Sequence, residues 1–209
     1  MDLRQLQDAT DPVGWSALAA IVILVLFFAD APSKTVGQRY QVERTRERIW
    51  LLFAELGLVI GWAFVYFRLG LDRPLLPAGW LAAGAERWLA LVGLAVVLFG
   101  VGLAVWAKLR LGRWFSGTFG VKEGHELVTD GPYGVTRHPI YTGLIAAVAG
   151  SAMVFDSLLT LALAVALGVP FYLHTVIEEE LFERHFGDAW RRYRARVPRL
   201  VPFTRWGGK

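Results

Sequence analysis

The first group of residues with chemical potential lies in the loop that contains Arg137 and His138. Pro139 follows them, and proline is favoured in the first turn of a helix, so the sequence predicts that a helix begins here. The first backbone N–H groups of a helix have no partner within it, and the helix dipole adds positive character at that end. An arginine and a histidine at such a point indicate a site for an anion such as a carboxylate.

The second group is the run of three glutamates from Glu178 to Glu180. Adjacent carboxylates repel one another unless a cation or a group rich in hydroxyls lies among them. The run directly follows an apolar segment, so it is expected where the chain leaves a membrane. Together the two groups predict a site for a ligand that carries both an acidic part and a cationic or hydroxyl-bearing part.

Each group also has a plain structural interpretation. Arginine and histidine beside the end of a membrane helix commonly serve as interfacial anchors. A glutamate run at a helix end is commonly a solvated face. The functional interpretation therefore depends on the two groups occurring together and in this order.

Apolar helices must position these groups. Apolar residues make up 55% of the 209 residues, more than a soluble domain of this size usually carries. A membrane-spanning helix needs about 20 mostly apolar residues, and segments 13–29, 49–67 and 88–107 approach that length. The stretch 140–177 is interrupted near Asp156, which we expect to cap its second half. The sequence thus predicts an all-α integral membrane protein with five transmembrane helices, of which spans four and five form a helical hairpin.

The Lys and Arg residues predict the orientation of the chain. With the N-terminus outside, all of them except Arg4, Arg68, Arg73 and Arg87 lie on the inner side, in agreement with the positive-inside rule. Both polar groups described above then face the cytoplasm. We expect the protein in the cytoplasmic membrane of a prokaryote.

The region after residue 177 is amphipathic, with apolar residues at spacings of three and four, and is expected to form a cytoplasmic helical segment divided near Gly187. We therefore divide the chain into an N-terminal region of three spans, 1–111, and a region with the polar groups, 112–209. The absence of cysteine excludes disulfides and thiolate metal sites, and no metal is expected. The basic residues flank apolar segments, which indicates membrane lipids rather than nucleic acid as partners.

The segment from Gly124 to Pro202 resembles the isoprenylcysteine carboxyl methyltransferase and phospholipid methyltransferase superfamily of integral membrane enzymes. The resemblance covers about the last two-fifths of the chain, and its elements occur in the order and at the spacing of the family pattern. They are His125-Glu126-Leu127-Val128, Gly131-Pro132-Tyr133, Arg137-His138-Pro139-Ile140-Tyr141, Glu178-Glu179, Phe186-Gly187, Tyr193 and Val197-Pro198.

The resemblance implies transfer of a methyl group from S-adenosyl-L-methionine to a lipophilic acceptor in the membrane. It also implies that the His-x-Leu-Val segment binds around the adenosine. The other elements would complete the cofactor cavity. The residues are His125, Glu126, Leu127, Val128, Tyr133, His138, Pro139, Ile140, Tyr141 and Glu178. Arg137, His174 and Glu179 are the expected catalytic residues, with Arg137 positioning the acceptor.

One position departs from the family pattern. Four residues before the paired glutamates, where carboxyl methyltransferases of this kind carry an arginine that meets the acceptor, the chain has His174. A neutral histidine can remove a proton, whereas arginine stays charged, so the acceptor is either a carboxylate or a phenol or quinol hydroxyl. His174 can also be an interfacial residue without a chemical role. An NADPH-dependent membrane reductase and a non-catalytic membrane scaffold are the alternative functions.

Overall fold

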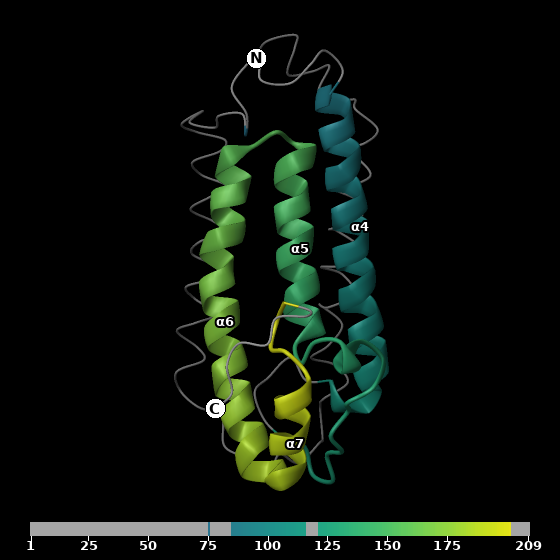
Figure 1. The fold of residues 1–209 in the computed structure, drawn as a ribbon, viewed down its shortest axis with the longest axis vertical. Helices are drawn as coiled ribbons and strands as arrows, with labels where there is room; N and C mark the ends of the chain where they lie inside the picture. The colour runs from purple at the N-terminus through teal and green to yellow at the C-terminus, as the bar shows by residue number, and fades with distance from the viewer. Residues whose placement is uncertain (1–74, 76–84, 116–120, 202–209) are drawn as a thin grey trace.

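The computed structural model describes residues 75, 85–115 and 121–201, and this part of the chain is helical, with no strand element (Figure 1). Its elements are the helices α4 (Ala85–Leu111), α5 (Pro139–Val154), α6 (Leu158–Phe186) and α7 (Asp188–Arg196) and the short 3-10 helices η3 (Gly112–Trp114) and η4 (Gly131–Gly134). The predicted spans 13–29 and 49–67 lie outside the described residues. The expectation of an all-α protein is confirmed for the described part.

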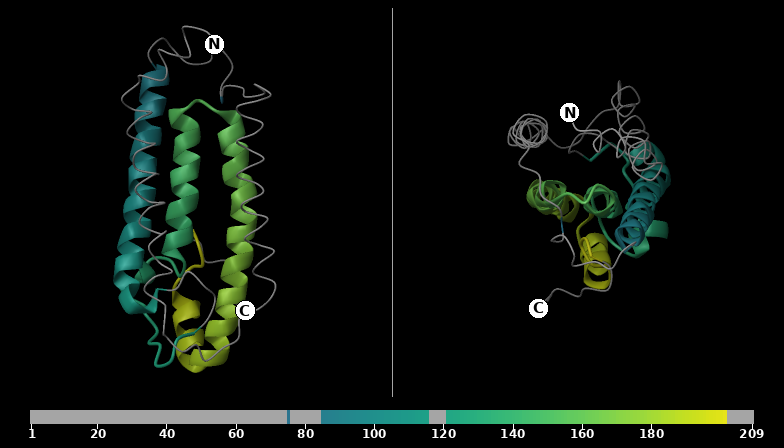
Figure 2. Two further views of the ribbon diagram at one scale, coloured as in Figure 1. Left: turned by 180° about the vertical axis from the view of Figure 1, so that it is seen from behind. Right: turned by 90° about the horizontal axis from the view of Figure 1, so that it is seen from above.

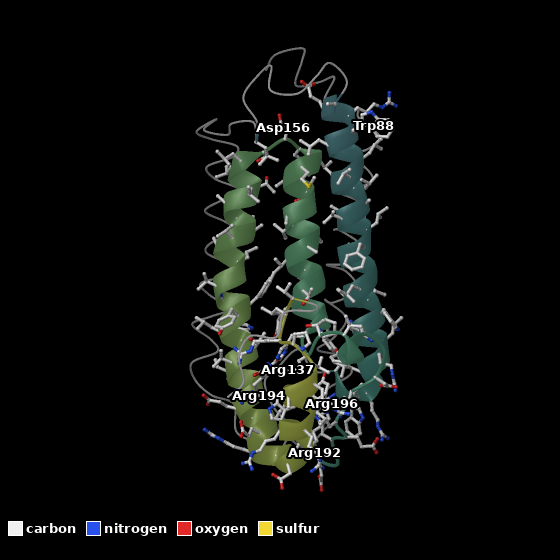
Figure 3. The ribbon with its side chains drawn as sticks, in the orientation of Figure 1. Trp88, Arg137, Asp156, Arg192, Arg194 and Arg196 are labelled. Atoms are coloured by element: carbon white, nitrogen blue, oxygen red, sulfur yellow. The ribbon has the colours of Figure 1, made fainter. Side chains whose placement is uncertain are left out.

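Helices α4 and α6 are long and apolar enough to cross a membrane. Helix α5 is also apolar but has 16 residues, which corresponds to about 24 Å at 1.5 Å per residue. Trp88 and Asp156 lie at one end of the bundle, and α7 lies at the other (Figure 3).

Helices α4 and α5 pack closely because small residues face one another along their contact. A Cβ atom added to Gly93 would lie 2.7 Å from the carbonyl oxygen of Gly150, and one added to Gly100 would lie 2.5 Å from that of Gly143. Both separations are far shorter than real Cβ contacts, so larger side chains would force the helices apart. The small residues Gly143 and Gly150 of α5 thus pack against α4.

The connection between α5 and α6 corrects one expectation from the sequence. Ser157, and not Asp156, caps α6: its hydroxyl accepts a hydrogen bond from the backbone N–H of Thr160 at 2.9 Å. Ser157 has the extended backbone of an N-cap, whereas Asp156 has a φ of 45° and occupies the turn. The carboxylate of Asp156 instead accepts a hydrogen bond from the backbone N–H of Leu75 at 2.9 Å.

The C-terminal region folds back against the end of the bundle (Figure 2). Helix α6 continues through the glutamate run to Phe186, and Gly187, with a φ of 53°, joins it to α7 where the sequence predicts a division. Trp190 and Tyr193 of α7 are buried, and the Tyr193 hydroxyl donates to the backbone carbonyl of Tyr133 at 2.7 Å. Helix α7 is therefore fixed to the loop that precedes α5.

The segment after α7, residues 197–201, runs beside the start of α5. The backbone N–H groups of Arg137 and His138 donate to the carbonyls of Pro198 and Arg199 at 2.9 and 3.1 Å. The Thr142 hydroxyl donates to the carbonyl of Leu200 at 2.8 Å. These bonds hold the C-terminal segment against the start of α5, beside the predicted site.

Candidate active site

Glu179 lies at the centre of a buried ionic cluster, which we define as Arg137, His138, Glu178, Glu179 and Arg199. Its Oε1 accepts from Nε of Arg137 at 3.0 Å, and Arg199 donates to both of its oxygens, to Oε1 at 3.0 Å and to Oε2 at 2.7 Å. Nε2 of His138 lies 3.2 Å from Oε1. One carboxylate thus joins α6, the start of α5 and the C-terminal segment.

Arg137 is enclosed by partners from α6 and from α7 with its C-terminal end. Besides its bonds to Glu179, its Nη1 donates to the carbonyls of Arg194 and Val197 at 2.9 and 3.0 Å, at the end of α7. Its guanidinium also lies 6.0 Å from the ring centre of Trp190. Figure 3 shows Arg137 within the bundle end and Arg192 and Arg196 farther out on α7. Arg137 thus ties α7 to α5.

His138 is buried between two carboxylates. Its Nδ1 lies 3.3 Å from Oε2 of Glu178, and its Nε2 faces Glu179. Burial by itself lowers the pKa of His138, but the hydrogen bonds and charges of Glu178 and Glu179 outweigh it, so the pKa is raised above 6.5. The protonated imidazole, which has two donors, suits this position.

Tyr141 connects Glu178 with His174. The Tyr141 hydroxyl donates to Oε1 of Glu178 at 3.0 Å, and its ring centre lies 6.0 Å from that of His174 in an edge-on arrangement. His174 and Glu178 are one turn apart on α6, so they share a face of that helix. His174 is itself buried. The structure therefore brings His138, Tyr141, His174 and Glu178 to one place.

His125 lies in a separate, aromatic environment. Its ring stacks on Trp114, with centres 4.9 Å apart and an interplanar angle of 10°, and it meets Phe182 and Phe186 of α6 edge-on at 6.2 and 5.7 Å. Burial lowers the pKa of His125 to about 4, with smaller contributions from His185 and Lys122. Its Nδ1 is buried and has no hydrogen bond within the described part of the chain.

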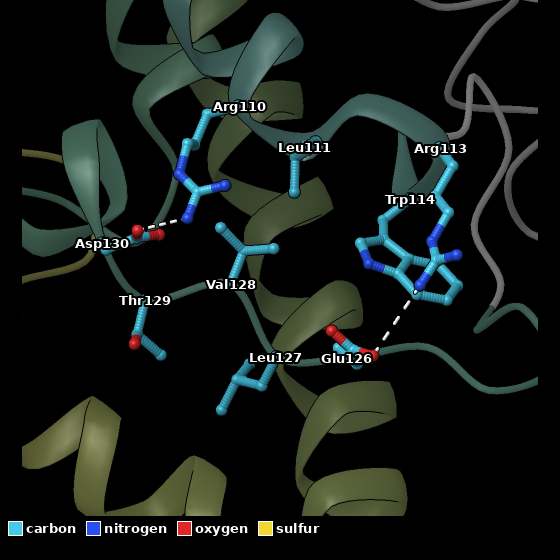
Figure 4. A pocket seen from close by; sticks show the side chains of 9 residues that line it. All are labelled: Arg110, Leu111, Arg113, Trp114, Glu126, Leu127, Val128, Thr129 and Asp130. Carbon is cyan, nitrogen blue, oxygen red and sulfur yellow. Dashed lines mark hydrogen bonds and ion pairs between the residues drawn. The ribbon is translucent and has the colours of Figure 1, made fainter.

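Beside His125, a cavity of about 450 Å³ opens between the end of α4 and the following loop (Figure 4). Such a volume suits a small organic ligand. Two ion pairs flank it, between Arg110 and Asp130 and between Arg113 and Glu126 at 3.7 Å. Its lining combines these charges with apolar and hydroxyl groups and consists of Arg110, Leu111, Arg113, Trp114, Glu126, Leu127, Val128, Thr129 and Asp130.

The structure separates the predicted cofactor residues into three groups. Glu126, Leu127 and Val128 line the cavity, with His125 beside it, whereas His138 and Glu178 belong to the ionic cluster and Tyr141 donates to Glu178. Tyr133 is buried, its hydroxyl donates to the carbonyl of Ala107 at 3.4 Å, and burial raises its pKa well above 10. Pro139 is buried in the first turn of α5, followed by the half-buried Ile140. Tyr133 and Pro139 thus support the site from within the protein.

Sequence reasoning missed Arg199, Trp114 and Trp190. Arg199 directly follows the Val-Pro element, but nothing in its local sequence shows that it reaches Glu179. Trp114 stacks on His125 from η3, the short helix after α4, and Trp190 is buried under Arg137. The periodicity of the C-terminal segment indicates that Trp190 is on an apolar face, but its partner comes from a distant part of the chain.

Comparison with known proteins supports the resemblance seen in the sequence. Residues 88–189 match the family model described as phospholipid methyltransferase. This stretch is similar to the isoprenylcysteine carboxyl methyltransferase and phospholipid methyltransferase superfamily, in agreement with the resemblance seen in the sequence. The likeness to these membrane proteins, together with the two long apolar helices, indicates an integral membrane protein.

Curated proteins match a little more than half of the chain. Protein-S-isoprenylcysteine O-methyltransferase B of Arabidopsis thaliana is 34% identical over 120 residues, which are 56% of this chain and 61% of the relative. The nickel-cobalt-cadmium resistance protein NccN of Alcaligenes xylosoxydans xylosoxydans is 33% identical over 123 residues, 56% of this chain and 55% of the relative. The chain thus spans less than two thirds of either relative.

A solved structure shows the same fold. The structure of the eukaryotic intramembrane Ras methyltransferase, isoprenylcysteine carboxyl methyltransferase, has a TM-score of 0.59 and 23% sequence identity. The comparison covers 94% of this chain and 70% of that one. At this identity the likeness supports a common architecture.

Proposed function

We propose that the protein transfers a methyl group from S-adenosyl-L-methionine to a lipophilic acceptor held in the membrane. The observation that carries the proposal is that His125, beside the cavity, and the ionic cluster contact the same helix, α6. His125 beside the cavity contacts Phe182 and Phe186 of α6, and the cluster meets the same helix at Glu178 and Glu179. Glu178 and Phe182 are four residues apart, which corresponds to about 6 Å along α6. One extended cofactor could therefore reach both the cavity and the ionic cluster. The family match favours this function over an NADPH-dependent reductase or a scaffold.

The chemistry of the donor set fits this cofactor, which combines an adenine ring, a ribose, a sulfonium and an amino acid. Trp114, Leu127 and Val128 offer apolar surface for a flat ring. Glu126 and Asp130 offer acceptors for hydroxyl groups, and the buried Nδ1 of His125 is a polar atom in need of a partner. At the cluster, Glu178 and the face of Tyr141 suit the cationic part.

Positioning is the main contribution of the protein in this proposal. When bound, the cofactor would supply an electrophilic methyl group on a sulfonium for transfer to the acceptor oxygen. Tyr141 and His138 hold Glu178 in a single orientation, and the C-terminal segment covers the site against water. Glu179, expected to be catalytic, has both oxygens occupied by cations, so we assign it a positioning role.

The acceptor is either a carboxylate or a phenol or quinol hydroxyl. A carboxylate needs no base, whereas a hydroxyl must lose its proton to become an effective nucleophile. His174 lies beside Tyr141 on the face of α6 that carries Glu178, within reach of the same site. We assign it the role of general base for a hydroxyl acceptor.

His174 can be tested by separating turnover from cofactor binding. His174→Ala should lower turnover sharply and leave the affinity for S-adenosylhomocysteine unchanged, because the imidazole would touch the acceptor and not the adenosine. His174→Arg should shift the preference toward carboxylate acceptors. Near-normal turnover of His174→Ala would show that the residue only packs at the interface.

We also propose the topology expected from the sequence, with five spans, the N-terminus outside and the site on the cytoplasmic side of a prokaryotic membrane. The acceptor would then enter sideways from the bilayer, and the cofactor from the cytoplasm. Accessibility of tags at the two termini tests the orientation, and a cytoplasmic N-terminus would overturn it.

Two measurements test the function itself. Isothermal titration with S-adenosylhomocysteine and with NADPH should show binding of the first alone. Incubation of the protein with extracted membrane lipids and labelled S-adenosylmethionine, followed by mass spectrometry, should show a labelled lipid product. Binding of NADPH without binding of S-adenosylhomocysteine would favour the reductase.

A further inference from the structure

Lys122 is a buried cation to which the proposed mechanism gives no role. The residue is only 4% exposed, although lysine is usually found at the surface. Its Nζ donates to the backbone carbonyls of Arg113 and Phe115, to the latter at 2.7 Å. Burying an ammonium group is costly unless hydrogen bonds compensate it, and these two carbonyls provide such bonds. The side chain of Lys122 is therefore tied to the segment around η3.

The two carbonyls belong to the end of the helix formed by α4 and η3. The last carbonyls of a helix have no partner within it, and the helix dipole gives that end negative character. A lysine that donates to them therefore caps the helix and fixes its last turn. Trp114 lies between Arg113 and Phe115, so this cap holds the backbone on both sides of the indole.

The backbone of Lys122 holds the ring on which Trp114 stacks. The carbonyl of Lys122 accepts a hydrogen bond from the backbone N–H of His125 at 3.1 Å, which closes a tight turn. The rings of Trp114 and His125 are stacked, with centres 4.9 Å apart and an interplanar angle of 10°. Lys122 thus binds the backbone at both members of the stack, through its ammonium group at one and its carbonyl at the other.

The stack belongs to the cavity in which the adenosine is proposed to bind. Trp114 lines this cavity (Figure 4), whereas Lys122 does not. An aromatic side chain that is already fixed in place loses little conformational freedom when a flat ligand binds against it. A cap that fixes the backbone of Trp114 therefore prepares the cavity for a flat ring without touching that ring.

We infer that Lys122 is a positioning residue of the cofactor site, which holds Trp114 against His125 so that the two rings form a fixed wall of the cavity. This inference rests on the proposed function and deepens it, because it names the part of the cofactor that the wall receives, the adenine ring. The loss of Lys122 should therefore affect binding of the adenosine part and not binding at Glu178.

The first test observes the stack in the full chain in detergent without any ligand. The ring resonances of ¹³C-labelled histidine are recorded at about pH 8, where histidine is neutral, and those of His125 are assigned by their loss in His125→Gln. Stacking on the indole should displace them to high field. Lys122→Met keeps the length and the apolar part of the side chain, and it should reduce this displacement. Lys122→Arg can still donate to both carbonyls and should retain it.

The second test measures the dissociation constants of adenosine and S-adenosylhomocysteine by isothermal titration. Lys122→Met should weaken the binding of both ligands about three- to tenfold, as expected for the loss of one aromatic contact. Glu178→Ala should weaken the binding of S-adenosylhomocysteine alone, because adenosine lacks the part of the cofactor assigned to Glu178. Lys122→Arg should restore both affinities.

A double-mutant cycle shows whether Lys122 acts through Trp114. The effects of Lys122→Met and Trp114→Ala on adenosine binding should be less than additive, because both variants lose the same wall. Lys108→Met is the matched control. Lys108 also lies near the end of α4, and its Nζ is 5.0 Å from the ring centre of Phe115, so its removal should leave both affinities unchanged.

Three outcomes would overturn the inference: an unchanged His125 resonance in Lys122→Met, an unchanged adenosine affinity in that variant, or additive effects in the cycle. Lys122→Gln retains an amide donor and replaces Lys122→Met if that variant does not fold, with the same changes expected to a smaller extent. A wild-type protein that binds neither ligand would refute the proposed function. The His125 resonance would then still show whether Lys122 positions the stack.

Discussion

The two histidines expected to bind the cofactor occupy opposite environments. His138 lies between the carboxylates of Glu178 and Glu179, and its pKa is raised. His125 lies among Trp114, Phe182 and Phe186, and its pKa is lowered to about 4. One residue type thus provides a cation in one region and a neutral ring in the other, because the neighbouring groups decide the charge.

The same contrast holds for the arginine–carboxylate pairs. In the ionic cluster the pair between Arg137 and Glu179 is buried, so each charge depends on its partner. At the cavity the pair between Arg113 and Glu126 is exposed, and water can replace either partner. The cluster should therefore hold the fold together, while the cavity can exchange its internal contacts for a ligand.

The largest effect should follow from breaking the cluster at Glu179. Glu179→Gln leaves the buried guanidinium of Arg137 without a counterion and weakens the bond to Arg199. Loss of one partner of a buried pair costs about 3–5 kcal/mol. The midpoint of thermal unfolding in detergent should fall accordingly.

Glu180→Gln is the matched control for this variant. Its carboxylate is exposed and pairs with Arg184 at 3.7 Å, one turn along the helix. Such a pair contributes about 0.2–0.5 kcal/mol, so the unfolding midpoint should hardly move. Equal midpoints for the two variants would show that the cluster does not stabilise the protein.

The next largest effect is expected on ligand binding at Glu178, which lies on the side of the cluster that remains open to a ligand. Glu178→Ala should weaken binding of S-adenosylhomocysteine about tenfold, which corresponds to about 1.4 kcal/mol, and leave the protein folded. His138→Ala and Tyr141→Ala should weaken it as well, because both residues contact Glu178. Isothermal titration measures the three affinities, with Glu180→Ala as control. Unchanged affinity in all three variants would mean that the cofactor binds elsewhere.

The opposite pKa shifts predict opposite pH dependences of stability. His138 binds its proton more tightly in the folded state, so its contribution is complete below about pH 6.5 and is lost as the pH rises through its raised pKa. His125 stays neutral in the folded state, so its contribution is complete above about pH 6.5 and is lost as the pH falls toward 4. His138→Gln should remove the loss of stability at high pH. His125→Gln should remove the loss of stability at low pH.

Unfolding midpoints measured across this range test the pair of variants together. If both variants retain the wild-type pH profile, the two environments do not control stability through these histidines.

The smallest effect is expected at the rim of the cavity. Arg113→Gln removes an exposed pair with Glu126, and such pairs contribute about 0–1 kcal/mol. The unfolding midpoint should stay close to that of the wild type, while the affinity for S-adenosylhomocysteine changes severalfold because the residue lines the cavity. A large loss of stability would remove the distinction between the two regions.

Local sequence was sufficient to predict several features of this protein. The apolar lengths of α4 and α6, the start of α5 at Pro139 and the division at Gly187 all depend on neighbouring residues, which the sequence displays directly. The motif residues from His125 to Glu179 also follow from the sequence, since their types and order are sufficient for the resemblance. The cap of α6 was assigned one residue too early because Asp156 and Ser157 are both good caps, and only the backbone of the turn distinguishes them.

Tertiary structure decided what each of these residues does. Glu179 and Glu180 are adjacent in the sequence, yet one is buried among three cations and the other is exposed, because they point to different sides of α6. Arg199 reaches Glu179 only because the C-terminal segment pairs with the start of α5. Charge and accessibility depend on contacts between distant segments, and neither composition nor spacing contains those contacts.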